Sequence, residues 1–547
     1  MRLITLIIVL LLIVPLTQAQ DSGGNSEQKH LIYFTDKAES PYSLEQPELY
    51  LSSKALERRK RQGIAVTPRD FPVNPNYITA LKERGATVLF TSRWFNAAVV
   101  QCSPEKLAEL QSLTFVRSSQ NLNRVVTPAA GKKGTQENDS MRLAKAAFDA
   151  AYYGPAFHQS NMLGVPEMHA AGYKGEGMTI AVFDAGFPGV NSIGAFTHLF
   201  QNEQLKGTFD FVGRKQDVFG HNQHGTSVLS TMAAYEPGLL VGTAPKASYY
   251  LFRTEDAATE HNIEEVNWLL AAEFADSAGV DIINSSLGYT VFDDPSYSYS
   301  YSELNGNTSI VTRAADFAAA TGMLVVTSAG NEGNKAWRYI SAPADADSVL
   351  TVGAVDSLAN HAIFSSFGPT GDNRIKPDVV AMGQMVYVLS SSGRLGRSNG
   401  TSFSGPIMAG MVACLWQANQ ELTNMELLQL IRQSGSHYNN PNNSIGYGVP
   451  NFNRIVTSLT DPLHAGIVIT NPVGNEPILL VMDESWIKEH ALAQVYDATG
   501  KLVHSQLLVA NNRRHALSLK PSRLSKGVYL CKVSAGSKTV TLRFVKL

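Results

Sequence analysis

Five short, nearly continuous apolar runs constrain the fold of this 547-residue chain more than any other feature. They alternate with stretches of helical periodicity, such as NIEEVNWLLAAEFADSAG (262–279). Strands that are apolar along their whole length are typical of parallel strands buried on both faces beneath helices. Residues 152–460 are therefore predicted to form a doubly wound α/β domain with a mostly parallel sheet. The runs are MTIAVF (178–183), SYYLFR (248–253), VDIIN (280–284), MLVVT (323–327) and SVLTVG (348–353).

The N-terminus has the pattern of an export signal. Arg2 precedes an apolar run from Leu3 to Leu16, and small residues follow up to Ala19. The run is short for a bilayer span, so residues 1–19 are predicted to be a cleaved signal peptide. We expect the mature protein to be exported.

A small α/β unit is predicted over residues 28–122. The polar and basic residues of 123–151, which include VVTPAAGKKGTQENDS (125–140), are predicted to form an exposed, cleavable linker. The elements expected in the unit are strands at 30–34, 87–91, 97–101 and 114–117 and a helix at 103–110.

Residues 461–547 return to short strands separated by turn signals such as DATGK (497–501). Strands of this length and spacing predict a compact β-sandwich. The expected strands are AGIVIT (465–470), ILLVMD (478–483), ALAQVYD (491–497), KLVHSQLLV (501–509), HALSLK (515–520), GVYLCKVS (527–534) and KTVTLRFVKL (538–547).

Charge and cysteine content exclude some functions. Lys and Arg number 45 against 47 Asp and Glu, so the net charge of −2 gives no reason to expect a nucleic-acid partner. The three cysteines, Cys102, Cys414 and Cys531, are far apart in the sequence and are expected to be packed free thiols.

Three polar stretches carry candidate catalytic residues. Asp184 directly follows the run MTIAVF, His224 opens the helical run HGTSV, and Ser402 lies in SNGTSFSGPIMAG (398–410), where an apolar helix begins. Each residue has a structural alternative. These are a turn-forming Asp, a structural His (His221 is a second such candidate) and a serine N-cap, which contributes about 1 kcal/mol. The three stretches are more informative together than singly, because they occur in the order Asp, His, Ser.

With these motifs, residues 152–460 resemble the subtilisin-like serine proteases, whose catalytic residues have this order. The resemblance implies a secreted serine endopeptidase that hydrolyses proteins or peptides without a cofactor. His224 would accept the proton of Ser402, and Asp184 would orient the imidazole and stabilise its charged form. The alternative is a binding protein or adhesin that reuses the subtilisin fold with little activity.

The same resemblance assigns residues around the catalytic serine. Asn331 in VVTSAGNEGN (325–334) would donate to the oxyanion, although an asparagine in a turn is its structural alternative. The segment FRTED (252–256) is the expected opposite wall of the cleft. The residues implied in binding an extended substrate strand are Ser286, Leu287 and Gly288 of INSSLG, together with Gly330.

A structural calcium ion is a further expectation from the resemblance. Oxygen donors of the kind that calcium prefers gather in one loop, although their spacing equally suits a solvated polar loop. The candidates are Asp293, Asp294, Asn305 and Asn307.

Residues 28–122 resemble the subtilisin propeptide in their arrangement and position. The resemblance implies that this unit assists folding and inhibits the enzyme until it is removed, and an accessory binding domain is the alternative.

The C-terminal segment resembles the sorting domain of the type nine (Por) secretion system. The matching blocks are NPVGN (471–475), VYDATGKLV (495–503) and LSKGVYLCKV (524–533). The resemblance implies a Gram-negative cell and passage through the periplasm and the outer-membrane secretion machinery to the cell surface or the medium. A β-sandwich that binds carbohydrate or protein is the alternative.

Overall fold

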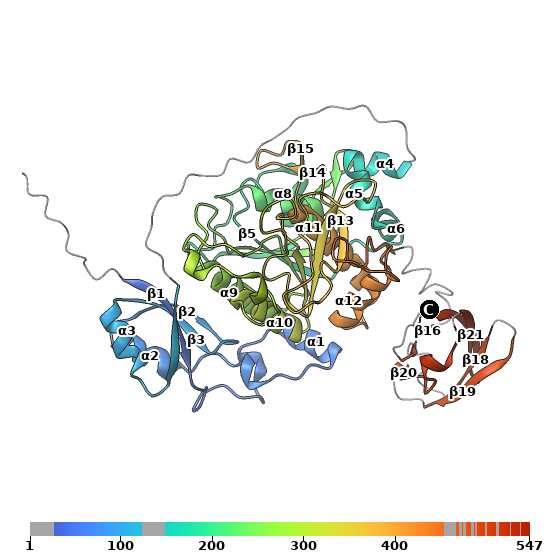
Figure 1. Cartoon of the computed structure of the whole chain (residues 1–547), viewed down its shortest axis with the longest axis horizontal. Coiled ribbons are helices and arrows are strands. Elements are labelled where there is room, and N and C mark those ends of the chain that lie inside the picture. The colour runs from blue at the N-terminus through green and yellow to red at the C-terminus, as the bar shows by residue number, and fades with distance from the viewer. Residues whose placement is uncertain are drawn as a thin grey trace, which may run out of the picture.

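The computed structural model describes residues 27–122, 148–452 and, with short gaps, 467–546. They form an N-terminal, a central and a C-terminal domain, coloured from blue to red in Figure 1. The predicted signal peptide and residues 123–147 of the predicted linker lie outside the described residues, whereas residues 148–151 belong to helix α4 (Phe148–Tyr153). None of the helices in the described part is long and apolar enough to cross a membrane.

A seven-stranded sheet in the order β13-β12-β11-β10-β5-β9-β6 forms the centre of the central domain. Every pair of neighbouring strands is parallel, so the predicted α/β sheet is confirmed. The sequence did not predict β6, a mostly half-buried edge strand, or β13, which has four residues. The strands are β5 (Thr179–Asp184), β6 (Leu205–Asp210), β9 (Ser248–Arg253), β10 (Ile282–Ser285), β11 (Leu324–Ser328), β12 (Val349–Val355) and β13 (Val379–Met382).

Helices cover both faces of this sheet. Successive side chains of a strand point to opposite faces, so Val182 lies in one core and Ala181 and Phe183 in the other. Helices α8 (His224–Ala233) and α11 (Thr401–Ala418) pack in the first core, and α9 (Ile263–Ala278) and α10 (Ile310–Ala320) pack in the second. The remaining elements of the central domain are α5 (Phe157–Asn161), α6 (Val165–Ala170), α7 (Thr197–Gln201), α12 (Asn424–Gln433), β7 (Tyr235–Glu236), β8 (Leu240–Val241), β14 (Val386–Leu389) and β15 (Leu395–Ser398).

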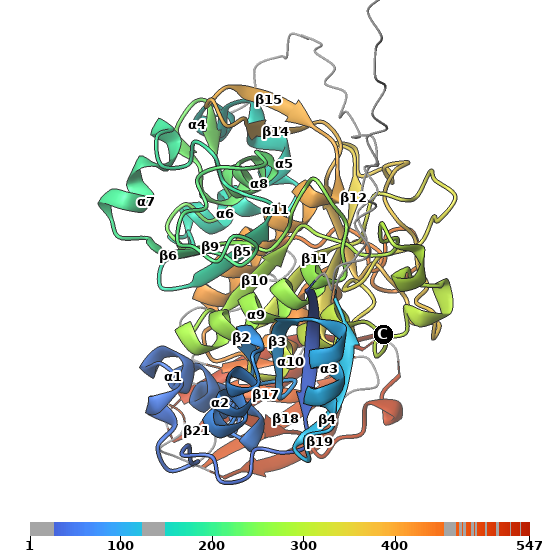
Figure 2. The same ribbon diagram turned by 90° about the vertical axis from the view of Figure 1, so that its left-hand side faces the viewer.

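The N-terminal domain is an antiparallel sheet in the order β2-β3-β1-β4 with three helices. Ile32 and Phe34 face this domain's own core, whereas Leu31 joins an apolar cluster with residues of α9 and α10. Figure 2 shows the domain against these two helices. The predicted strands and α3 are present, and α1 and α2 are additional. The elements are β1 (Gln28–Phe34), α1 (Ser53–Gln62), α2 (Pro75–Glu83), β2 (Thr87–Ser92), β3 (Ala97–Cys102), α3 (Pro104–Gln111) and β4 (Val116–Asn121).

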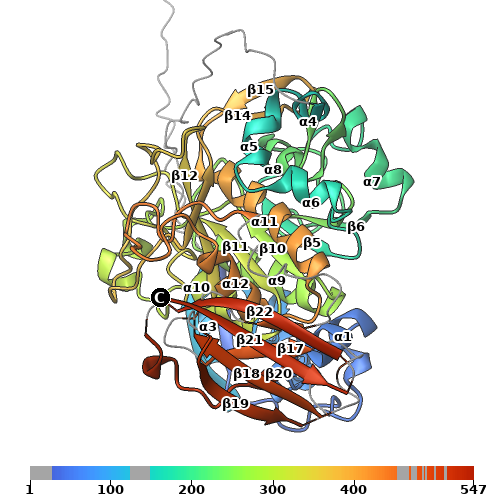
Figure 3. The same ribbon diagram turned by 90° about the vertical axis from the view of Figure 1, so that its right-hand side faces the viewer.

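The C-terminal domain consists of two antiparallel sheets, β16-β17-β20 and β19-β18-β21-β22, which share one apolar core (Figure 3). All seven predicted strands are present, and the β-sandwich is confirmed. Cys531 lies in this core, and all three cysteines are buried and free. The strands are β16 (Ile467–Ile469), β17 (Leu479–Met482), β18 (Ala491–Asp497), β19 (Leu502–Leu508), β20 (Arg514–Ala516), β21 (Gly527–Ala535) and β22 (Lys538–Lys546).

Candidate active site

Asp184, His224 and Ser402 lie where three elements of the central domain begin or end. Asp184 is the last residue of β5, His224 is the first residue of α8, and Ser402 is the second residue of α11. In open α/β sheets, functional groups gather at the carboxyl ends of the strands. The fold thus brings together residues that are 40 and more than 170 positions apart in the sequence.

The pair of Asp184 and His224 is formed in the structure. Nδ1 of His224 lies 2.8 Å and 3.0 Å from the two carboxylate oxygens of Asp184. A carboxylate only accepts hydrogen bonds, so Nδ1 carries the proton and Nε2 is left as the basic nitrogen. Asp184 is fully buried and also accepts the N–H of Ala185 (2.8 Å), which fixes its orientation.

The charge of Asp184 decides the protonation of His224. Burial would lower the pKa of the imidazole, but the negative charge of Asp184 and the hydrogen bond to it raise the pKa above its ordinary value of 6.5. The His224 side chain is 34% exposed, so one side of the ring is open to a reactant. This pair can accept a proton and stabilise the resulting imidazolium.

Ser402 lies near the N-terminus of α11, a helix that is buried along most of its length. Its hydroxyl donates to the carbonyl of Ser286 (3.4 Å), and the Ser286 hydroxyl donates to the carbonyl of Ser402 (3.0 Å). The ring of the next residue, Phe403, lies 5.9 Å from that of His224, centroid to centroid. The residue that follows Ser402 is therefore close to His224. In free enzymes, catalytic hydrogen bonds are often long and tighten only when substrate binds.

The amide of Asn331 is oriented by the residue before Ser402. Its Oδ1 accepts the backbone N–H of Thr401 (2.9 Å) and the Thr401 hydroxyl (3.0 Å). Thr401 in turn accepts the N–H of Gly330 (3.2 Å). With Oδ1 occupied, Nδ2 is the donor that lies beside Gly400, 3.7 Å from where a Cβ would stand on that glycine. An amide N–H is thus placed next to the start of α11.

The predicted substrate-binding segment continues β10 beyond the sheet. Ser286 is buried and Leu287 is half-buried, whereas Gly288 is exposed. A Cβ on Gly288 would lie 2.1 Å from Oγ of Ser341, so a larger residue there would require the Ser341 side chain to move. Gly330 has a φ of +108°, which favours glycine, and a Cβ there would lie 2.9 Å from Oγ of Ser366 and 3.0 Å from Oγ of Ser341. The hydrogen bonds between Ser286 and Ser402 hold this segment beside the start of α11.

Three of the four calcium candidates accept hydrogen bonds from backbone N–H groups. Asp293 accepts the N–H of Glu260 (3.0 Å), Asp294 that of Ser296 (3.0 Å), and Asn305 that of Asn307 (3.0 Å). These oxygens close turns in their own and a neighbouring loop. Calcium binding by this set remains a prediction.

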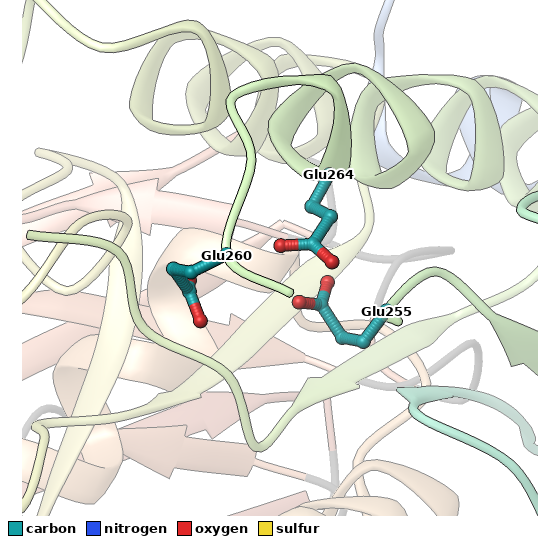
Figure 4. Close-up of side chains that lie close together, drawn as sticks. All are labelled: Glu255, Glu260 and Glu264. Carbon is teal, nitrogen blue, oxygen red and sulfur yellow. The ribbon is translucent and has the colours of Figure 1, made fainter. Parts of the chain in front are cut away.

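A cluster of carboxylates that the sequence did not predict lies in the segment 252–256 and in the residues that follow it. Glu255, Glu260 and Glu264 have carboxylate oxygens within 4.8 Å of one another, and Figure 4 shows Glu255 and Glu264 facing each other. Glu255 also accepts the hydroxyl of Tyr289, which joins the segment 252–256 to the residue after Gly288.

Protonation explains how these carboxyl groups can be so close. Burial, together with the neighbouring carboxylates, raises the pKa of Glu255 to about 8 and that of Glu264 to about 10. Both groups therefore hold protons at neutral pH and would have to release them to bind a cation. Glu264 also accepts the N–H groups of Asp256 (2.9 Å) and His261 (3.2 Å), so it closes the loop that leads into α9.

Comparison with known proteins identifies the family of the central domain. The sequence model of the subtilase family matches residues 175–448, and the chain belongs to this family. Subtilisin NAT of Bacillus subtilis subsp. natto is 29% identical over 279 residues, which are 50% of this chain and 65% of that protein. Subtilisin DY of Bacillus licheniformis is 33% identical over 252 residues, covering 46% and 80%, respectively. Subtilisin Savinase of Lederbergia lenta is 29% identical over 278 residues, covering 51% and 90%. The chain thus spans slightly less than two thirds of subtilisin NAT.

The flanking domains match families of their own. Residues 29–139 match the peptidase S8 propeptide domain of Bacteroidota, and residues 471–547 match the secretion system C-terminal sorting domain. Both resemblances inferred from the sequence are confirmed. The propeptide match extends beyond residue 122, so it includes part of the predicted linker.

Proposed function

We propose that the chain is the precursor of an exported serine endopeptidase, with Ser402 as nucleophile, His224 as general base and Asp184 as the residue that orients His224. The observation that carries the proposal is the bond from Nδ1 of His224 to the buried Asp184 (2.8 Å), with the ring of Phe403, the residue after Ser402, 5.9 Å from the ring of His224. A serine hydroxyl is a weak nucleophile at neutral pH and needs such a base.

The reaction proceeds through an acyl-enzyme. Nε2 of His224 accepts the Ser402 proton while Oγ attacks the carbonyl carbon of the substrate. The imidazolium then gives this proton to the leaving amine, and a water molecule hydrolyses the ester by the same steps. Asp184 stays ionised and stabilises the imidazolium.

Two donors serve the negative oxygen of the tetrahedral intermediates. The first is Nδ2 of Asn331, because Thr401 occupies the other atom of that amide. The second is the backbone N–H of Ser402, where the free N–H groups and the dipole of α11 favour negative charge. The substrate lies as an added strand along Ser286, Leu287 and Gly288.

The N-terminal domain acts as an inhibitor until the linker is cut. Strand β4 ends at Asn121, whose carbonyl accepts the side-chain amide of Asn262 (3.0 Å). The next residue, Leu122, is buried in the apolar cluster that includes Tyr289 and Phe292. The chain therefore leaves the N-terminal domain beside the substrate-binding edge. We place the cut between Asn121 and Tyr153.

The C-terminal domain directs the precursor through the outer-membrane secretion machinery, so the mature enzyme acts at the cell surface or in the medium. The chemistry uses no cofactor. A calcium ion at the loop of residues 293–307 would stabilise the fold without entering the reaction. Chelation should then lower the melting temperature and leave the rate per labelled serine unchanged.

Labelling with a fluorophosphonate probe tests the nucleophile, because an activated serine reacts and a capping serine does not. The chain should be labelled at Ser402 and should hydrolyse peptides. Ser402→Ala should abolish labelling and lower kcat by about 10⁶-fold, the loss known for subtilisin.

An unlabelled, inactive chain that has lost its N-terminal domain would support a binding protein instead. Near-normal hydrolysis by Ser402→Ala would remove Ser402 from the mechanism.

A further inference from the structure

Helix α1 of the N-terminal domain docks at the carboxyl end of α9. Its N-cap Ser52 donates its backbone N–H to the carbonyl of Ser277 (3.0 Å). Gly279, the C-cap of α9, has a φ of +82°, and a Cβ there would lie 2.6 Å from Cβ of Lys54. The two helices therefore approach as closely as their backbones allow.

Arg58 of α1 is buried between α9 and α10. Its Nη1 donates to the carbonyl of Val280 and its Nε to the carbonyl of Thr321 (3.1 Å). These carbonyls lie just past the ends of α9 and α10, where helices expose unpaired acceptors and partial negative charge. A guanidinium, which has five donors and no acceptor, suits such a place.

The carboxylate of Asp276, in the last turn of α9, receives the remaining donors. It is fully buried and accepts hydrogen bonds from Arg58, from Arg59 (2.7 Å and 3.1 Å) and from Arg93 in the turn after β2. All three arginines belong to the N-terminal domain. We call the Asp276 carboxylate and the carbonyl oxygens of Val280 and Thr321 the guanidinium site.

The N-terminal domain holds its arginines in position for this site. Arg59 also donates to Asp70 of its own domain (2.6 Å), so its guanidinium is oriented from both sides. Arg93 donates to the carbonyl of Glu273 (2.9 Å), one turn before Asp276. Oriented donors lose less entropy on binding, which favours affinity.

The guanidinium site lies near the amino ends of the strands, whereas the catalytic residues lie near the carboxyl ends. Asp281, which directly follows Val280, accepts the N–H of Thr179, the first residue of β5, whereas Asp184 is the last. The length of the six-residue strand β5, roughly 16 Å at the usual rise per residue, therefore separates the two ends. A ligand at the guanidinium site does not touch the substrate-binding edge.

We propose that the guanidinium site recognises a helix with two adjacent arginines, and that it holds the N-terminal domain on the peptidase after the linker has been cut. This inference rests on the proposed function, because only a zymogen needs such a cut.

The test uses the full chain with Ser402→Ala and with a recognition sequence for a site-specific protease in place of Lys132 and Lys133. After the linker is cut, the dissociation constant of the N-terminal fragment is measured by serial dilution and size exclusion. Arg58→Met should weaken binding about 10²–10³-fold, because it leaves Asp276 buried with a partner missing. The matched control is Lys60→Met, which removes an exposed charge from the same helix and should change binding less than about fivefold.

Equal affinities for the two variants would overturn the proposal. If Arg58→Met fails to fold, Asp276→Asn alters the site from the peptidase side and should weaken binding to a similar degree. Wild-type affinity in that variant would equally overturn the proposal.

The outcome is separable from that of the proposed function. Retention is measured in a chain that lacks the nucleophile, so it does not depend on catalysis. Fluorophosphonate labelling of the chain with Ser402 intact tests catalysis alone.

Discussion

Asp184 and Asp276 are both fully buried, Asp184 at the carboxyl end of β5 and Asp276 in the last turn of α9. Asp184 pairs with one histidine, whose side chain is 34% exposed and whose charge changes during a reaction. Asp276 pairs with three arginines, which keep their charge at any working pH. A buried carboxylate therefore serves proton transfer where its partner titrates, as at Asp184. It serves domain attachment where its partners keep their charge, as at Asp276.

The largest difference between Asp184 and Asp276 should appear in kcat and in fragment retention when each residue is replaced by asparagine. Asp184→Asn keeps the shape but favours the wrong tautomer of His224, so kcat should fall by about 10⁴-fold. Retention of the N-terminal fragment should stay unchanged, because the hydrogen bonds of the Asp184 side chain go to Ala185 and His224 of the central domain. Active-site titration followed by peptide hydrolysis measures the first quantity, and size exclusion after cleavage measures the second. Loss of both kcat and fragment retention in Asp184→Asn would mean that the catalytic residues and the guanidinium site are coupled.

The coupling between Asp276 and Arg58 is the next effect in size. Removing one partner of a buried pair costs about 3–5 kcal/mol. Because Arg58→Met and Asp276→Asn both remove the bond between these two side chains, the double variant should lose less affinity than the sum of the two single losses. Fragment dissociation constants for the four chains give the coupling energy. Additive losses would show that the arginine and the aspartate act independently.

The sequence predicted Asp184, His224 and Ser402 because each stands in a local motif beside a strand or helix that its own pattern reveals. The guanidinium site has no such signal, since Arg58 and Asp276 are 218 positions apart and meet only when two domains dock. Helix α1 escaped prediction for the same reason: its buried face is made partly of Arg58 and Arg59, which a search for apolar periodicity counts as solvent-exposed. The pairing of Glu255 and Glu264 was also not predicted, because the conformation of a loop brings them together and no sequence motif marks it.

The two aspartates should also differ in pH dependence. Catalysis needs neutral His224, whose pKa Asp184 raises above 6.5, so the acid limb of kcat/KM should lie above pH 6.5. Burial would raise the pKa of Asp276, but the charges of Arg93, Arg58 and Arg59 outweigh it and lower the pKa to about 2. A carboxyl with a lowered pKa stabilises the bound state above its ordinary pKa of 3.8 and loses this effect as the pH falls towards 2.

The measurement is the difference in fragment affinity between the wild-type chain and Asp276→Asn, taken from pH 8 to pH 3. Taking this difference removes the contribution of other groups, including His30, whose burial lowers its pKa. The difference should stay constant down to about pH 4 and shrink below it. A difference that disappears near pH 6.5 would assign the effect to a histidine and contradict the role of Asp276.

The smallest effect is expected at the rim of the docked helix. Arg61 lies 3.5 Å from Asp281 and its side chain is 32% exposed, so water competes for this ion pair. Asp281 keeps Lys54 (3.1 Å) and the N–H of Thr179 when Arg61 is removed, and no buried charge is left unpaired. Arg61→Met should therefore weaken binding of the fragment by less than about 1 kcal/mol, and 0.5 M salt should abolish this loss. The loss in Arg58→Met should persist in the same salt, because buried pairs are screened little. Equal salt sensitivity of the two variants would mean that Arg58 is hydrated in the bound state and that its burial does not set the affinity.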